Sequence, residues 1–155
     1  MVIAAEQHTG TESVSFADRV AKLRAIDTDV HNDLPSMHEL KPYLAREWHA
    51  WIDNGGPGFA SRAYANTGSG VMDDSVREED GLAAGDPDWV IQQLLKRFRI
   101  DIGVCTGSVI GTGIQHNARF ATALIAAYND WLLHKWIYPY DCFKEIGRAS
   151  CRERV

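Results

Sequence analysis

The run AIDTDVHN, residues 25–32, decides the fold that we expect for this chain. It is short, contains β-branched residues and ends in polar ones, which predicts a strand over residues 25–31. A second run of this kind, IDIGVCTG, predicts a buried strand over residues 100–106. A helical segment separates the two runs, so we expect them to be parallel neighbours in one sheet.

Helices are predicted on both sides of the second strand. Asp86-Pro87 places a capping side chain before a proline at the first helical position, and it begins a helix over residues 87–98. The longest segment with helical spacing of apolar residues predicts a helix over residues 118–137. This alternation of strands and helices indicates an α/β fold.

Shorter helices and one long loop complete the first half. Residues 16–24 favour a short helix, and Ser36 with Glu39 three positions later forms a capping-box pattern. The Gly-, Asp-, Ser- and Asn-rich segment that follows is expected to be a long loop, and such loops are often functional. Arg62 and Arg77 in this loop are candidates to grip an anionic substrate, and the alternative is that both are solvated.

Three ionisable residues alternate along the first strand. In a regular strand Asp27, Asp29 and His31 point to the same side. A divalent cation would neutralise such a face, and imidazole with carboxylate suits Zn or Mn. The alternative is a strand end at which Asp caps a turn and His packs on the surface. Haloacid-dehalogenase phosphatases also carry Asp-x-Asp, but usually with Thr or Val at the position of His31.

Composition excludes several classes of function. The chain has 155 residues, is 45% hydrophobic and is long enough to bury a core. A net charge of -5 without a basic stripe argues against nucleic acid. No apolar run reaches the roughly 18 residues of a membrane span. Because the start is unlike a signal peptide and the three cysteines show no CxxC spacing, a cytoplasmic location is expected.

A glycine-rich turn follows the second strand. Thr106-Gly107 with Gly111 and Gly113 resembles the TGxxxGxG turn of short-chain dehydrogenases, where glycine lets the backbone approach a pyrophosphate. Such a strand normally opens its domain, whereas about 100 residues precede this one. We therefore expect a loop that lines a site, with Thr106 and His116 as possible substrate contacts. The alternative for His116 is a place beside Asn117 at the cap of the next helix. Nucleotide binding is the alternative.

Five segments carry a family resemblance: IDTDVHNDLP, PYLAREW, DPDWVIQQLL, IDIGVCTG and FATALIAAYNDWL, in this order over about residues 25–137. They are similar to the amidohydrolase-related family, which includes aminocarboxymuconate-semialdehyde decarboxylase-like metal-dependent hydrolases. The resemblance implies a TIM-type (β/α)₈ barrel, typically of about 250 residues. The chain would be its N-terminal fragment, with about the first two βα units and a long loop.

The resemblance also implies a ligand set. In this family the first barrel strand supplies two metal ligands, which correspond to Asp29 and His31 here. Asp27 would lie deeper in the barrel and orient these ligands without binding the metal. The family's other ligands, a His from a middle strand and an Asp from the last, are implied to lie outside this chain, as are the catalytic residues. Sites in such barrels lie at the carboxyl ends of the strands, so Asp29 and His31 should emerge beside Thr106.

The last segment, EIGRASCRERV, is expected to be foreign. The codons that it implies resemble a widely used sequencing adapter read in frame, and the alternative is a native basic tail. The expected organisation is therefore a lead-in over residues 1–24, a partial metal-dependent hydrolase barrel over 25–144 and a non-native tail over 145–155.

The expected function is that of a truncated metal-dependent amidohydrolase-related enzyme. It would hydrolyse or decarboxylate a small carbonyl or carboxylate compound, with Zn, or else Mn, as cofactor. A fragment with two ligands should itself be inactive. A small molecule is the expected partner, and a homo-oligomeric parent enzyme is left open. The alternatives are an NAD(P)-dependent oxidoreductase that uses the turn 106–113, and a fragment without function.

Overall fold

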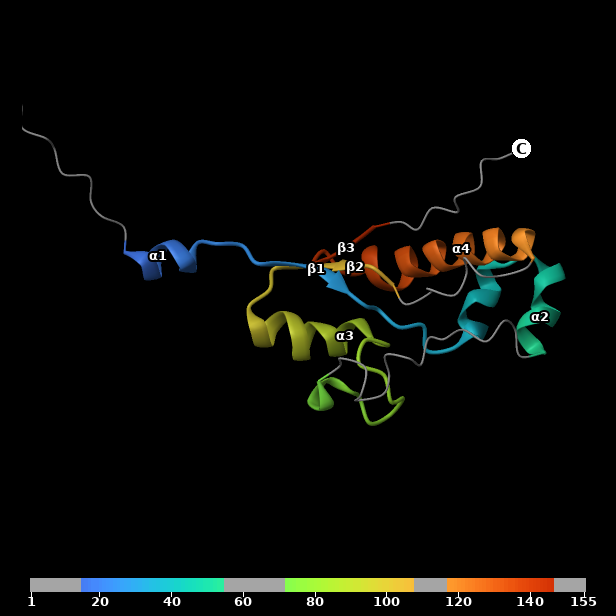
Figure 1. Ribbon diagram of the computed structural model, residues 1–155, viewed down its shortest axis with the longest axis horizontal. Helices are drawn as coiled ribbons and strands as arrows, with labels where there is room; N and C mark the ends of the chain where they lie inside the picture. The colour runs from blue at the N-terminus through green and yellow to red at the C-terminus, as the bar shows by residue number, and fades with distance from the viewer. Residues whose placement is uncertain (1–14, 55–71, 108–116, 147–155) are drawn as a thin grey trace, which may run out of the picture.

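A parallel sheet lies at the centre of the molecule (Figure 1). The computed structural model describes residues 15–54, 72–107 and 117–146. The strands β1 (Ile26–Val30), β2 (Ile102–Cys105) and β3 (Phe143–Glu145) follow one another in the order β1-β2-β3, and both pairings are parallel. The two predicted strands are therefore parallel neighbours, as expected, and β3 adds a strand that the sequence did not predict.

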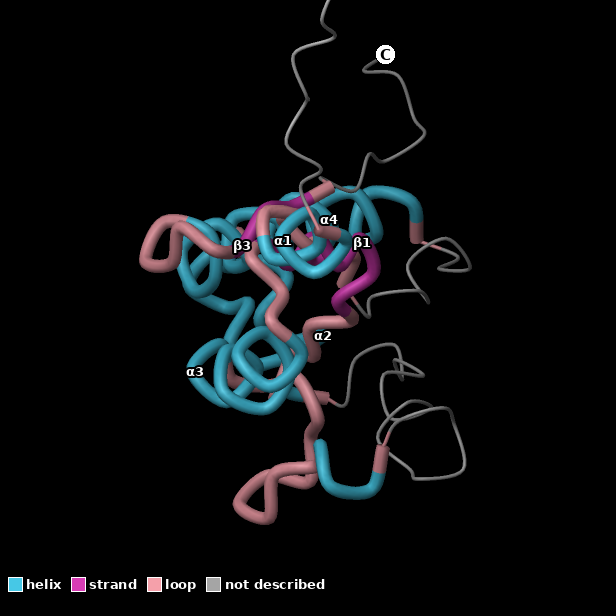
Figure 2. Tube along the Cα trace, turned by 90° about the vertical axis from the view of Figure 1, so that its left-hand side faces the viewer, coloured by secondary structure: helices cyan, strands magenta, loops and turns pink. Residues whose placement is uncertain are grey.

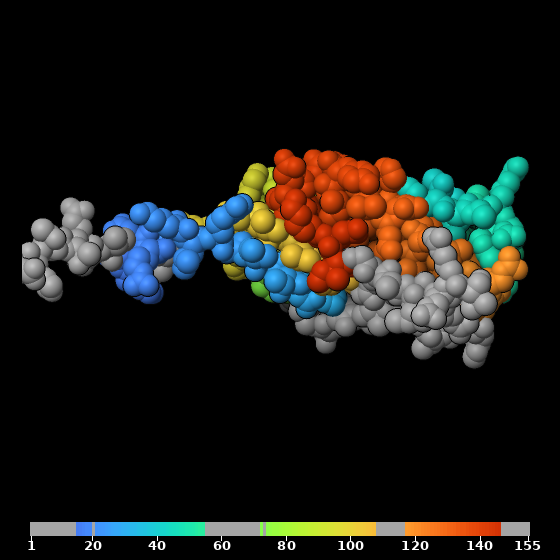
Figure 3. Space-filling view, turned by 90° about the horizontal axis from the view of Figure 1, so that it is seen from above, coloured from blue at the N-terminus to red at the C-terminus, as the bar shows by residue number. Residues whose placement is uncertain are grey.

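Helical segments connect the strands. Figure 1 shows α2 beside the N-terminal end of α4, which is the end away from the strands. Figure 2 shows α3 below the layer that holds α4 and the strands. The first helix stands apart from the body, which is plain in the space-filling view of Figure 3. In chain order the segments are α1 (Phe16–Ala21), η1 (Met37–Tyr43), η2 (Arg46–Trp48), α2 (His49–Asp53), η5 (Asp73–Ser75), α3 (Pro87–Val90), η6 (Ile91–Lys96), α4 (Ala118–Leu132) and η8 (Leu133–Ile137).

Both long helices begin at side-chain caps. The Asp86 carboxylate accepts a hydrogen bond from the backbone N–H of Trp89 at 3.1 Å, as the Asp86-Pro87 pattern predicts. At the start of α4, Asn117 Oδ1 accepts from the N–H of Phe120 at 3.1 Å. Each helix continues into a π-helical turn, η6 after α3 and η8 after α4. The predicted helices over 87–98 and 118–137 are thus confirmed in extent, although their last turns are wider than α-helical ones.

The segment after Ser36 differs from the prediction. Ser36 Oγ accepts from the N–H of His38 at 3.2 Å, but the helix that follows is a 3₁₀ helix. Glu39 does not complete a capping box, because its carboxylate accepts from the indole N–H of Trp131 at 2.8 Å. The side chain that the sequence assigns to a local cap therefore joins η1 to α4.

One hydrophobic core joins the sheet to the helices. Val30, Cys105 and Phe143 are buried on the three strands, and the α4–η8 segment contributes Tyr128 and Trp136. The rings of Trp136 and Phe143 meet edge to face with their centroids 5.2 Å apart. The same cluster includes residues from α3, η6 and the segments after β1, among them Val90, Leu95, Leu40 and Ile52.

The structure confirms the α/β class. A strand order of 1-2-3 occurs at the start of a (β/α)₈ barrel, and it also occurs in one half of an open doubly wound sheet. The barrel therefore stays a prediction.

Candidate metal site

Asp29 and His31 lie together at the carboxyl end of β1. Asp29 Oδ1 and His31 Nε2 are 3.1 Å apart, and the two side chains are 70% and 36% exposed. An imidazole–carboxylate contact at this exposure is worth about 1 kcal/mol or less, whether or not the imidazole is protonated. The contact between Asp29 and His31 therefore contributes little to the stability of the fold.

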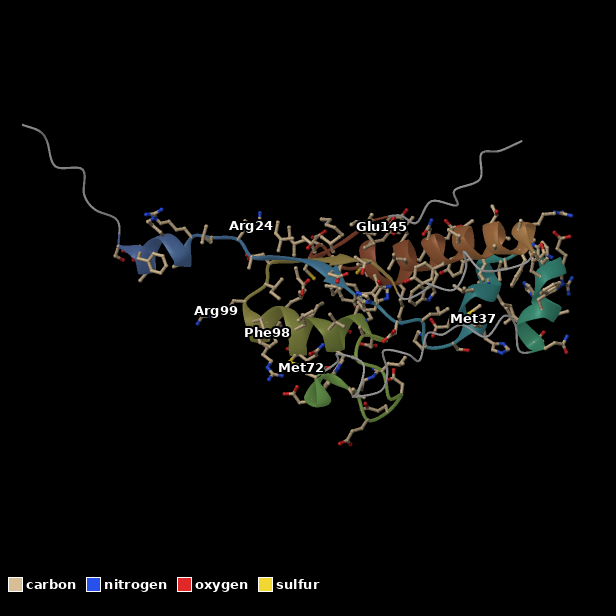
Figure 4. The ribbon with its side chains drawn as sticks, viewed as in Figure 1. Arg24, Met37, Met72, Phe98, Arg99 and Glu145 are labelled. Carbon is tan, nitrogen blue, oxygen red and sulfur yellow. The ribbon has the colours of Figure 1, made fainter. Side chains whose placement is uncertain are left out.

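The carboxyl end of β2 adds Thr106 to the pair. The Thr106 hydroxyl donates to Asp29 Oδ1 at 3.1 Å, and the Thr106 N–H donates to the carbonyl of Val30 at 2.9 Å. In Figure 4, Arg24 and Arg99 lie toward the α1 side of the molecule, where β1 and β2 begin, whereas Glu145 lies at the other end of the strands. The prediction that Asp29 and Thr106 emerge at one end of the sheet is confirmed.

A register shift separates Asp27 from this group. Asp27 aligns with Gly103 and Val30 with Cys105, so three steps on β1 match two steps on β2. The regular alternation expected for this strand is therefore interrupted between Asp27 and Val30. Asp27 Oδ1 instead accepts from the backbone N–H of Asp29 at 3.0 Å, so it contacts the candidate ligand through the main chain.

A buried polar layer next to the site was missed by sequence reasoning. Asn32 Nδ2 donates to the hydroxyl of Tyr128 at 2.9 Å, and Asn32 Oδ1 accepts from the N–H of Gly107 at 3.0 Å. The sequence placed Tyr128 on an apolar helix face, which accounts for its ring and not for its hydroxyl. The available signal was a polar residue directly after one strand and a glycine directly after the next.

Arg77 forms ion pairs with carboxylates of its own loop. Its guanidinium contacts the carboxylates of Asp80, Asp86 and Glu79, the last two at 3.4 and 3.9 Å. The hydrogen bond to Asp80 raises the pKa of Arg77, and the same bond lowers the pKa of Asp80. Three carboxylates around one guanidinium leave no local excess of positive charge. These contacts support a structural role for Arg77 over the predicted role in gripping an anionic substrate.

Gly107 has a packing reason to be glycine. Its φ is +71°, and a Cβ there would lie 2.5 Å from the hydroxyl oxygen of Tyr128. Its N–H already donates to Asn32. The first glycine of the dehydrogenase-like turn is thus explained without a pyrophosphate. Four other residues named in the sequence predictions lie outside the described residues, namely Arg62, Gly111, Gly113 and His116.

The geometry of Asp29 and His31 fits two ligands of one ion. Oxygen and nitrogen ligands at roughly 2.0–2.1 Å from Zn, at angles between 90° and tetrahedral, lie about 2.9–3.4 Å apart. The separation of 3.1 Å falls within this range. In the described ranges no group of three or more His, Cys, Asp or Glu side chains is placed to hold a metal ion. The pair therefore needs further ligands to become a complete site.

Comparison with known proteins adds no family assignment. No protein-family model matches the chain, and no curated protein matches it at a significant level. Among the helices that the structure describes, none combines the length and apolar character needed to cross a bilayer. The similarity to the amidohydrolase-related family therefore stays a prediction based on the five sequence segments.

Proposed function

We propose that this chain is the N-terminal part of a metal-dependent hydrolase or carboxy-lyase of the amidohydrolase-related kind. Its substrate would be a small carbonyl or carboxylate compound in the cytoplasm. The observation that carries the proposal is the pairing of Asp29 and His31, 3.1 Å apart, at the carboxyl end of a parallel strand. Barrel enzymes build their sites at this end of the sheet.

Asp29 and His31 would each give one ligand to a divalent ion, Zn in the first instance and Mn as the alternative. When bound, such an ion lowers the pKa of a coordinated water or polarises a substrate carbonyl or carboxylate. The Thr106 hydroxyl and the Asp27 carboxylate hold Asp29 by its side chain and its main chain respectively. Contacts of this kind orient a ligand and tune its affinity for the metal.

The remaining ligands and the general base are proposed to come from later barrel strands. Two protein ligands leave at least half of the coordination sphere of Zn or Mn to be filled, so this chain by itself should bind metal weakly and turn over no substrate. A homo-oligomeric assembly is compatible with this proposal and is not required by it.

The test is the metal content and turnover of a protein that joins this chain to the later strands. Asp29→Ala and His31→Ala should each lower both quantities by roughly tenfold or more, because each removes one of few ligands. Asp27→Asn should have a smaller effect, since it weakens only a contact to the main chain. Full metal occupancy in His31→Ala would remove that residue from the site.

A matched control is available on the surface. His38 Nδ1 and Asp53 Oδ1 form another exposed imidazole–carboxylate pair, 3.7 Å apart, on η1 and α2. The double variant His38→Ala with Asp53→Asn should keep metal content and turnover unchanged. An equal loss in this control would show that any histidine–carboxylate pair gives the effect, and would contradict the proposal.

A further inference from the structure

A buried polar pair adjoins the candidate metal site. Asn32 follows His31 in the chain and is 0% exposed, and Tyr128 of α4 is 1% exposed. Polar groups buried to this extent need hydrogen-bond partners. Asn32 and Tyr128 form hydrogen bonds with each other. Asn32 Nδ2 donates to the Tyr128 hydroxyl at 2.9 Å, and that hydroxyl donates to the backbone carbonyl of Asn32 at 3.4 Å.

The same asparagine joins the two strand ends. Its Oδ1 accepts from the N–H of Gly107 at 3.0 Å. The neighbouring residues Asp29 and Thr106 are joined by their own hydrogen bond at 3.1 Å. The residues that follow β2 thus have two hydrogen bonds to the end of β1 and the segment after it, one to Asp29 within β1 and one to the buried Asn32.

An amide is the side chain that this position requires. Asn32 both donates, to Tyr128, and accepts, from Gly107. A carboxylate would place a charge in a fully buried position, and an aliphatic side chain would leave the Gly107 N–H without its acceptor. Asn32 is also the chain neighbour of His31, so a change in its position moves the histidine backbone.

We infer that Asn32 and Tyr128 are positioning residues, which fix the separation of Asp29 and His31 for binding a divalent ion. The inference rests on the proposed metal site. Neither residue would touch the ion. They act through the backbone of residues 31–32 and through Gly107, and removal of the Tyr128 hydroxyl should therefore loosen the pair without emptying the core.

Tyr128→Phe tests this inference, with Tyr138→Phe as its matched control. Both variants lose one hydroxyl, but Tyr138 is 68% exposed and lies beyond α4. Each protein is titrated with Co²⁺ while its visible absorption spectrum and its thermal unfolding are recorded. We expect Tyr128→Phe to bind Co²⁺ roughly tenfold more weakly, with an altered absorption band. Tyr138→Phe should match the wild type in both.

The outcomes separate this inference from the proposed function. If Tyr128→Phe unfolds at a lower temperature but keeps the wild-type Co²⁺ affinity and spectrum, the role is merely structural and the inference is wrong. If the wild type binds no Co²⁺ at this position, the proposed function fails. The NMR signals of the His31 ring then decide the inference: a shift in Tyr128→Phe and none in Tyr138→Phe supports it, and unchanged signals overturn it.

A second variant guards against misfolding. If Tyr128→Phe shows no cooperative unfolding, Asn32→Ser takes its place in the same measurements, because serine removes the amide from its contacts with Tyr128 and Gly107 and adds no charge to the buried position. Weaker Co²⁺ binding or shifted His31 signals support the positioning role. Wild-type binding and unchanged signals overturn it.

Discussion

The Asp29–His31 pair and the Arg77 loop both hold candidate binding residues in the sequence, and they differ in the structure. Asp29 is 70% exposed and contacts an imidazole and a hydroxyl at the ends of two strands. Arg77 is 26% exposed, and carboxylates of its own loop surround its guanidinium. An ion at the first group would meet an exposed carboxylate, whereas a ligand at the second would have to replace ion pairs that Arg77 already forms.

This difference shows how a binding group can be told from a structural one. Opposite charges within one loop neutralise each other and hold the loop in shape, as Arg77 and Asp80 do. The Asp29–His31 pair lies instead where the carboxyl ends of parallel strands converge, which is the binding edge of α/β proteins. The predictions below alter one group while the other serves as the reference.

The largest expected effect comes from Gly107→Ala, next to the Asp29–His31 pair. The φ of +71° costs an alanine about 1–2 kcal/mol, and overlap of its Cβ with the Tyr128 hydroxyl costs about 1–3 kcal/mol more. We expect the free energy of unfolding to fall by about 2–5 kcal/mol, measured by urea denaturation.

Gly81→Ala in the Arg77 loop is the matched control. Its φ is +69°, but among the described residues nothing lies within 4 Å of the position that a Cβ would take. The expected loss is therefore the backbone cost alone, about 1–2 kcal/mol. Equal losses in the two variants would show that the contact with Tyr128 does not restrict Gly107.

Arg77→Met should destabilise the fold more than His31→Ala. The methionine keeps the aliphatic stem but leaves the carboxylates of Asp80 and Asp86 without the guanidinium that both contact. We expect a loss of about 1–2 kcal/mol in the free energy of unfolding, against less than about 1 kcal/mol for His31→Ala. Urea denaturation of both variants at pH 7 checks the order. The reverse order would make Arg77 the dispensable residue and His31 the structural one.

The smallest expected effect is on the acid side of the stability profile. Arg77 lowers the pKa of Asp80 below its ordinary value of 3.8. A lowered pKa stabilises the fold fully above the unfolded value, and the contribution is lost as the pH falls through the folded value. The stability difference between wild type and Arg77→Met should therefore shrink below about pH 4, by less than about 1 kcal/mol. Unfolding followed from pH 7 down to pH 2.5 checks this, and a difference that grows in acid would be inconsistent with the Arg77–Asp80 contact.

Local chemistry made a large part of the fold predictable. The β-branched runs located β1 and β2, and Asp86-Pro87 located the start of α3 because its cap is formed within four residues. The pair of Asp29 and His31 was also found, since both lie within one short segment. Each of these features depends on residues that are close in the chain.

The features that could not be predicted depend on distant partners or on register. The hydrogen bond between Asn32 and Tyr128 joins residues 96 positions apart, and the polar residue after the first strand does not by itself indicate which distant side chain it contacts. The register shift after Asp27 arises from pairing with β2 and is invisible in β1 alone. The strand Phe143–Glu145 is too short to show a period of two, and only its pairing with β2 defines it.

The central claim, that Asp29 and His31 present a metal site, is tested most directly by paramagnetic broadening from Mn²⁺ in the ¹⁵N-labelled chain. This measurement locates even a weakly bound ion. If Asp29 and His31 bind the ion, the amide signals of residues 28–33 and 105–107 broaden first, and the double variant Asp29→Asn with His31→Ala abolishes this broadening. Broadening centred on the acidic loop 78–86 and unchanged in the double variant would contradict the claim.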